Sequence, residues 1–152
     1  GVLFVLGFFL MAYKGFDRID SITANLGCVF ALGVALCPTT SSNQVVHILH
    51  FVFAMLLFST FIFFSIYLFR KSDPHKKCSP QKNKRNVIYL TCGIIMIAAI
   101  ASIVVSIFWL EEASQRYHLV FWFESLALIS FGFSWITKAE FLFLKDEEQN
   151  GH

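Results

Sequence analysis

The stretch that decides the fold is residues 86–110, NVIYLTCGIIMIAAIASIVVSIFWL, which contains no Asp, Glu, Lys or Arg. A helix that crosses the hydrocarbon core of a bilayer needs about 20 consecutive apolar residues, and this stretch is longer than that. Four further apolar runs accompany it along the chain. They cover residues 1–13, 21–38, 45–69 and 119–143. The five runs predict an all-α fold, a polytopic transmembrane bundle with about five membrane-spanning helices.

The composition agrees with a membrane protein. Hydrophobic residues make up 57% of the 152 residues, charged residues make up 14%, and the mean hydropathy is +0.66. A soluble domain of this size has too much surface to carry that balance, whereas helices in a bilayer can be apolar on their outer faces. A membrane β-barrel would alternate apolar and polar residues, and residues 51–58, FVFAMLLF, do not alternate.

The first run is too short to cross a bilayer as it stands. We expect it to be the C-terminal part of a helix that continues upstream, or a short first span. A cleavable signal peptide is the alternative, but residues 14–17, KGFD, lack the expected basic leader and cleavage site. We therefore predict a single membrane domain over residues 1–145.

Three polar segments separate or follow the later runs. Residues 70–85 are predicted to form a flexible basic loop, because they contain two prolines among charged residues. Glu111 to His118 is predicted to be an outer loop, and residues 146–152 are predicted to be an acidic flexible tail.

The distribution of positive charge predicts an orientation. If all five runs cross the membrane, eleven of the twelve Lys and Arg residues fall on one side, and Arg116 is the exception. Cytoplasmic loops carry an excess of Lys and Arg. We expect an integral protein of a bacterial cytoplasmic membrane, with its N-terminus outside and its C-terminus and the loop 70–85 in the cytoplasm.

The basic loop is a candidate for binding lipid headgroups, since each Lys or Arg near an anionic membrane surface contributes about 1 kcal/mol. The alternative is that these charges do no more than set the topology. A nucleic-acid partner is not expected, because no folded domain accompanies the charges. The candidate residues are Arg70, Lys71, Lys76, Lys77, Lys82, Lys84 and Arg85.

A second candidate site lies at the predicted outer level. Glu124 is within the fifth run, about 7 Å below its outer boundary, where a carboxylate must be paired, protonated or in a polar cavity. His47 and His50 share a helix face at the start of the third run. Cys37 and His118 are predicted at the same level, so the five residues form a candidate ligand-binding pocket.

The same histidines and Glu124 also suggest a metal site. Two imidazoles, a carboxylate and a water can bind zinc and activate the water for hydrolysis. The plain alternative is that His47 and His50 are helix-start residues facing water or headgroups. Zinc is the one cofactor that the sequence suggests, and no phosphate loop, serine-nucleophile elbow or HExxH motif is present.

A compact charged turn follows the first run. It contains Lys14, Asp17, Arg18 and Asp20, and Asp20 or Ser21 is predicted to cap the next helix. Local ion pairs explain the turn, and docking to lipid phosphates or to the basic loop is the functional alternative.

Small and aromatic residues predict how the helices pack and where they meet the interface. Ala98 and Ser102, and likewise Ser130 and Ser134, are small residues four apart, which allow close approach of another helix. One interfacial aromatic belt is expected to include Tyr13, Tyr67, Tyr89 and Trp135.

Three stretches carry a resemblance to a known kind of protein. They are residues 13–20, YKGFDRID, residues 31–39, ALGVALCPT, and residues 131–140, FGFSWITKAE. The chain resembles small bacterial multi-pass membrane proteins of a domain-of-unknown-function family. The resemblance implies a helical bundle with those polar turns as family features, and it implies no activity.

Together these features lead to one main functional expectation and two alternatives. The main one is a non-enzymatic bundle that binds a lipid, a small ligand or a partner helix through the outer pocket. The first alternative is a metal-dependent intramembrane hydrolase that uses His47, His50 and Glu124. The second is a transporter or channel subunit, which would need a homo-oligomer or a partner membrane protein.

Overall fold

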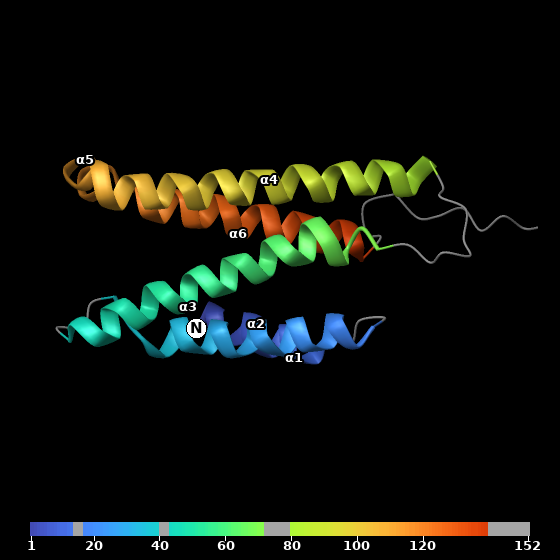
Figure 1. The fold of residues 1–152 in the computed structure, drawn as a ribbon, viewed down its shortest axis with the longest axis horizontal. Helices are drawn as coiled ribbons and strands as arrows, with labels where there is room; N and C mark the ends of the chain where they lie inside the picture. The colour runs from blue at the N-terminus through green and yellow to red at the C-terminus, as the bar shows by residue number, and fades with distance from the viewer. Residues whose placement is uncertain (14–16, 40–42, 72–79, 140–152) are drawn as a thin grey trace, which may run out of the picture. The chain divides into compact units, whose positions relative to one another are not determined.

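The computed structural model of the chain describes residues 1–13, 17–39, 43–71 and 80–139, and these residues are almost entirely helical (Figure 1). No strand occurs among them, so the predicted all-α class is confirmed. The elements are α1 (Val2–Ala12), α2 (Arg18–Leu36), α3 (Gln44–Phe63), the π-helix η1 (Phe64–Leu68), α4 (Pro80–Trp109), α5 (Glu111–Tyr117) and α6 (Leu119–Lys138).

Four of these helices are long and apolar enough to cross a membrane, namely α2, α3 with η1, α4 and α6. They contain 19, 25, 30 and 20 residues. The apolar helix α1 has 11 residues, about 16 Å at 1.5 Å per residue, which is shorter than a hydrocarbon core of about 30 Å. The chain is therefore a helical membrane protein with four candidate spans and one short apolar helix.

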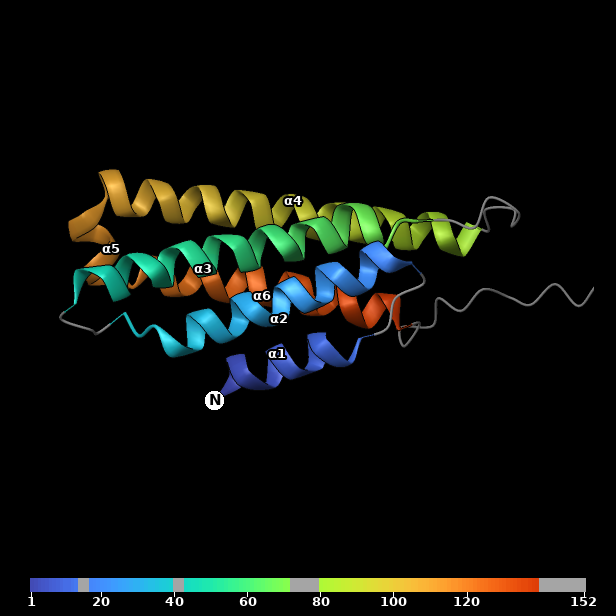
Figure 2. The same ribbon diagram turned by 60° about the horizontal axis from the view of Figure 1, so that its bottom comes forward.

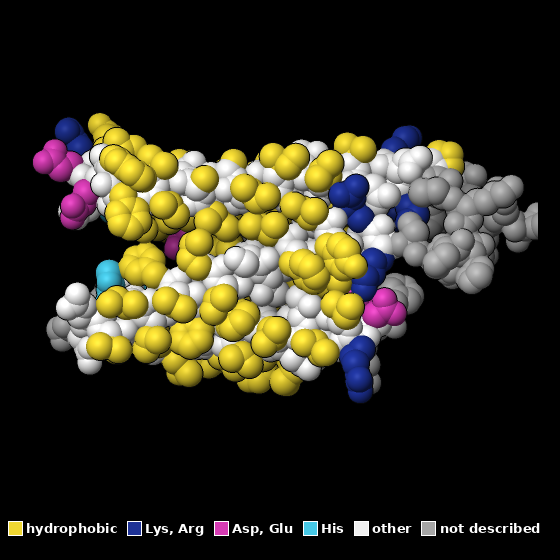
Figure 3. Space-filling view, viewed as in Figure 1, with side chains coloured by type: hydrophobic (Ala, Val, Ile, Leu, Met, Phe, Trp, Pro, Cys, Tyr) yellow, Lys and Arg dark blue, Asp and Glu magenta, His cyan; other side chains and the backbone are white. Residues whose placement is uncertain are grey.

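The surface has the composition that lipid contact requires. Large apolar side chains are exposed along the helices, for example Ile129 at 69% and Phe108 at 74%. Figure 3 shows such side chains covering much of the visible face. In water this exposure would favour aggregation, whereas in a bilayer these side chains meet lipid tails.

The described chain divides into two compact units, Gly1–Phe61 (unit 1) and Ile62–His152 (unit 2). The prediction that the whole chain acts as one membrane domain stays a prediction.

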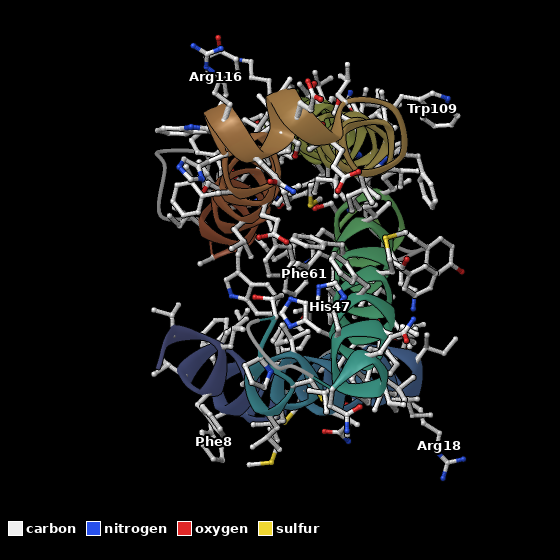
Figure 4. All side chains as sticks on the ribbon, turned by 90° about the vertical axis from the view of Figure 1, so that its left-hand side faces the viewer. Phe8, Arg18, His47, Phe61, Trp109 and Arg116 are labelled. Carbon is white, nitrogen blue, oxygen red and sulfur yellow. The ribbon has the colours of Figure 1, made fainter. Side chains whose placement is uncertain are left out.

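In unit 1, α1 packs along α2 through small residues, and both ribbon views show the two helices side by side (Figures 1 and 2). A Cβ added at Gly7 would lie 3.5 Å from the carbonyl oxygen of Cys28, so the two backbones approach closely. Leu10 and Ala24 are fully buried. The opposite face of α1 is exposed, and Figure 4 shows Phe8 pointing away from α2.

In unit 2, α4 and α6 form an antiparallel pair (Figures 1 and 2). Ser130 and Ser134 are buried on α6, as their spacing predicts. The prediction for Ala98 is wrong, because Ala98 is exposed. The buried face of α4 passes one residue further on, through Ala99 and Ile103.

Parts of two predicted loops are helical among the described residues. Helix α4 begins at Pro80, so the second part of the predicted loop 70–85 belongs to the helix. Proline is favoured in the first helical turn because it has no N–H to satisfy and its φ is already helical. The predicted outer loop is the helix α5, whose acidic first turn and Arg116 in the last turn complement the helix dipole. His118 ends this helix with φ of 52°.

The charged turn before α2 also differs from the prediction. Asp17, rather than Asp20 or Ser21, is the N-cap, and the backbone N–H of Asp17 donates to Oδ2 of Asp20 over 3.4 Å. This reciprocal capping box starts the helix one turn earlier than an Asp20 cap would. Arg18 is exposed and points away from α2 (Figure 4), and Lys14 lies outside the described residues. The predicted tail at 146–152 lies outside them as well.

Candidate functional site

Positive charge gathers at one end of unit 2, where α4 begins and α6 ends. Six of the seven described basic residues of this unit belong to that end, and Arg116 in α5 is the seventh. The described acidic residues of the unit are Glu111, Glu112 and Glu124, towards the other end of the helix pair. Figure 3 shows this separation on one face. We call the six residues the basic end: Arg70, Lys71, Lys82, Lys84, Arg85 and Lys138.

A polar stripe on α4 forms the centre of the basic end. Lys82, Arg85, Asn86 and Tyr89 are spaced i, i+3, i+4 and i+7, so they share one face of the helix. Arg85 is 7% exposed and Tyr89 is 2% exposed. The same face continues into the apolar core at Met96, so the core-facing side of α4 starts with charged and polar groups.

Aromatic rings connect this stripe to the other helices. The ring of Phe69 lies 5.5 Å from the ring of Tyr89 and 5.3 Å from that of Trp135, measured between centroids. The ammonium Nζ of Lys138 lies 5.9 Å from the centroid of Phe69. A cation over a ring face is attracted to the π electrons. Phe69 therefore holds Lys138 of α6 next to the polar stripe of α4.

The π-helix η1 places Phe69 there. Its turns close by i to i+5 hydrogen bonds, and the N–H of Phe69 donates to the carbonyl oxygen of Phe64 over 2.9 Å. The wider turn brings Phe64 and Phe69 towards one face, and both are buried. Ser65 Oγ donates to Ser134 Oγ over 2.8 Å, which fastens η1 to α6 within the core.

One atom of the stripe lacks a partner. The amide oxygen Oδ1 of Asn86 is buried and accepts no hydrogen bond within the part of the chain that the structure describes. Leaving a buried acceptor unsatisfied costs about 1–3 kcal/mol, so native structures contain few such groups. A bound ligand that donates a hydrogen bond would remove this cost.

Helix α4 is longer than the hydrocarbon core of a bilayer, so Lys82, Arg85 and Asn86 can lie outside that core. Its 30 residues span about 45 Å, which exceeds a hydrocarbon core of about 30 Å by about 15 Å, or ten residues. The polar residues Lys82 to Asn86 occupy that excess at the Pro80 end, since residues 87–109 are apolar enough to fill the core. The basic end can therefore meet phosphate groups at the membrane surface.

The predicted headgroup candidates are only partly brought together. Arg85 is buried, Lys71 and Lys82 are half-buried, and Arg70 and Lys84 are exposed. Lys76 and Lys77 lie outside the described residues. Asn86 and Lys138 were not predicted as part of a site. Tyr89 was predicted to belong to an interfacial aromatic belt, and its side chain is buried. The helical spacing from Lys82 to Tyr89 was the signal that could have identified the stripe.

In unit 1, the structure brings two of the predicted outer-site residues together. The Nδ1–H of His50 donates to the backbone carbonyl oxygen of Cys37 over 2.6 Å, because a carbonyl oxygen can only accept. In the neutral ring this leaves Nε2 of His50 as an acceptor. His47 is exposed. The imidazoles of His47 and His50 make T-shaped contacts with the ring of Phe51, with centroid distances of 4.9 and 5.7 Å.

The other two outer candidates belong to unit 2. Glu124 is half-buried on α6, and His118 is exposed at the start of that helix. Within each unit, no three described His, Cys, Asp or Glu side chains form a group that could hold a metal ion. The predicted pocket and the zinc site of His47, His50 and Glu124 require residues of both units, and they stay predictions.

Comparisons with known proteins identify no relative. No protein-family model matches the chain, and neither a curated protein nor a solved structure matches it. The resemblance to bacterial multi-pass membrane proteins therefore stays a prediction, and the function rests on the chemistry of the residues.

Proposed function

We propose that the chain is a non-enzymatic multi-pass membrane protein that binds an anionic phospholipid at the basic end of unit 2. One observation carries this proposal: Arg85 is buried on the polar stripe of α4, and Lys138 of α6 lies over Phe69, whose ring meets Tyr89 of the same stripe. A guanidinium can bind phosphate oxygens through two parallel hydrogen bonds, and an ammonium adds a point charge.

The proposal includes an orientation. We place the basic end on the cytoplasmic side of a bacterial membrane, because the positive-inside rule favours that side for six of the seven described basic residues of unit 2. Anionic headgroups at that surface attract such clusters. This differs from the outer pocket that the sequence suggested, and it rests on residues within one unit.

The outer end supports a second candidate, the binding of zinc or a small hydrogen-bond donor by His50 and His47. The observation that favours it is the bond from His50 to the carbonyl of Cys37. Metal-binding histidines usually donate their second ring N–H to a carbonyl or carboxylate, which fixes the ring and exposes the other nitrogen. Zinc bound to purified protein, and lost in His50→Ala, would support this function.

Lipid preference tests the main proposal. Purified protein in detergent micelles is mixed with equal amounts of phosphatidylglycerol and phosphatidylcholine, and bound lipid is counted by native mass spectrometry. Two cations at about 1 kcal/mol each predict about a thirtyfold preference for the anionic lipid. High salt should weaken this preference. Equal occupancy by the two lipids at low salt would rule the proposal out.

A further inference from the structure

We propose that the α5 end of unit 2 is a membrane-interface anchor. Exposed aromatic side chains insert among the headgroups and glycerol groups of one leaflet, and the charged helix α5 stays on their water side. This surface lies at the other end of the α4 and α6 pair from the basic end, so it adds to the proposed function without depending on it. We call its aromatic residues the aromatic collar: Phe108, Trp109, Tyr117, Phe121 and Trp122.

Two backbone corners turn α5 across the ends of the helix pair. Leu110 leaves the helical conformation after α4, with φ of −126° and ψ of 36°. His118 takes a left-handed conformation between α5 and α6, with φ of 52°. Figure 4, which looks along the helix pair, shows α5 crossing from α4 to α6. Since α4 and α6 are candidate membrane spans, α5 lies along the membrane surface.

The tryptophans of the aromatic collar lie at the ends of the spans. Trp109 is the last residue of α4, and Trp122 is about 4.5 Å along α6 from its first residue, Leu119. The 20 residues of α6 extend about 30 Å, the thickness of a hydrocarbon core, so its first turn reaches the boundary of that core. Trp109 is 74% exposed and Trp122 is 63% exposed. Figure 4 shows Trp109 pointing away from the helices.

The surface changes in order along this end of unit 2. The side chains on the membrane side of the aromatic collar are aliphatic and exposed, for example Val105 on α4 and Ile129 on α6. On the other side, Glu111, Glu112 and Arg116 are exposed on α5. Figure 3 shows acidic and basic side chains at the tip of this end, beyond the apolar surface. The aromatic collar is therefore continuous with the lipid-facing surface and separates it from the charged helix.

The chemistry of the aromatic collar fits the region between hydrocarbon and water. A tryptophan has a large apolar ring and one N–H donor, so an exposed indole is best placed where its body meets lipid and its N–H meets an acceptor. Headgroup and glycerol oxygens are such acceptors, and Trp and Tyr are enriched at this level of membrane proteins. Charged side chains are costly within hydrocarbon, so α5 has to lie on the water side. A bilayer leaflet matches this whole sequence of surfaces, whereas a water-soluble partner would match only the charged part.

Depth-dependent fluorescence quenching tests the anchor. Two variants of the full chain retain one collar tryptophan each: Trp122→Phe with Trp135→Phe retains Trp109, and Trp109→Phe with Trp135→Phe retains Trp122. Each protein is reconstituted in phosphatidylcholine vesicles with bromine either near the glycerol end of the acyl chains or near their methyl ends. Both indoles should lose more fluorescence with bromine near the glycerol end.

Trp135 is the matched control, retained in Trp109→Phe with Trp122→Phe. It is half-buried, and its ring lies 5.6 Å from the ring of Phe64, 5.3 Å from that of Phe69 and 5.5 Å from that of Phe131, measured between centroids. It should therefore lose less fluorescence than either collar tryptophan. The wild-type protein, which contains all three tryptophans, should also be quenched more strongly by bromine near the glycerol end, and this comparison tests the anchor even if a variant does not fold.

Three results would overturn the anchor. Stronger quenching of the collar tryptophans by bromine near the methyl ends would place the α5 end inside the hydrocarbon core. Quenching by iodide in the water, with none by either brominated lipid, would place it away from the membrane. No quenching by iodide or by either lipid would mean that another protein or a second copy covers the aromatic collar. Because phosphatidylcholine is the sole lipid, each result is separate from the anionic-lipid preference of the basic end.

Discussion

Replacing Arg85 with glutamine is expected to weaken binding of phosphatidylglycerol by about tenfold to a hundredfold. Arg85 is 7% exposed on the stripe whose Tyr89 meets the ring of Phe69, so a phosphate bound there meets its guanidinium with little competing water. Charge-assisted hydrogen bonds of this kind contribute about 1.5–3 kcal/mol, which corresponds to that loss. Lipid titration of the variant and the wild type, followed by native mass spectrometry, measures the ratio.

Lys84→Gln is the matched control for Arg85→Gln. It removes the same charge from the adjacent residue, which is exposed on another face of the helix. Its loss should be no more than about fivefold, the value of one charge near the surface at about 1 kcal/mol. Arg85→Lys keeps the charge and loses the two-pronged geometry, so an intermediate affinity is expected. If Lys84→Gln weakens binding as much as Arg85→Gln does, the buried site is wrong and diffuse surface charge explains the lipid preference.

The membrane class and the helical fold could be predicted because each depends on long stretches of sequence. Residues 86–110 exceed the length of a membrane span with no charged residue, and no local detail can reverse that. The turn after α2 was equally predictable, since Pro38 cannot continue a helix and Ser42 or Asn43 can cap the next one. The structure agrees: α2 ends at Leu36, and Asn43 Oδ1 accepts from the N–H of Val45 over 3.0 Å.

The basic end could not be predicted in full, because it depends on which face of each helix is buried. Lys82 and Lys84 are equally basic in the sequence, but Lys82 is half-buried on the helix face of Arg85 and Tyr89, whereas Lys84 is exposed on another face. Phe69 itself is placed by the π-helix, whose wider turn has no sequence signature. Proline often occurs in loops, so Pro80 suggested a loop in the sequence. In the structure it is the first residue of α4, a position where proline is favoured.

A second expected result concerns the packing within unit 1. Gly33→Ala should lower the thermal stability of the protein, because the added Cβ would lie 2.5–2.7 Å from Cγ, Cδ1 and Cδ2 of the Phe53 ring. Rotating the ring about its own axis does not move Cγ, so the whole side chain or the backbone of α2 or α3 has to shift. Forcing an extra carbon into a packed contact costs about 1–3 kcal/mol.

Gly132→Ala isolates that cost. Apart from its chain neighbours and the nearby backbone of α6, no described atom lies within 4 Å of a Cβ added at Gly132. Both substitutions gain the same helix propensity, up to about 1 kcal/mol for replacing glycine with alanine, so the difference between them reports the contact with Phe53 alone. Thermal unfolding in detergent, followed by the helical circular dichroism signal, should give a higher midpoint for Gly132→Ala than for wild type and a lower one for Gly33→Ala. Equal midpoints for the two variants would mean that α2 and α3 do not pack through Gly33 and Phe53.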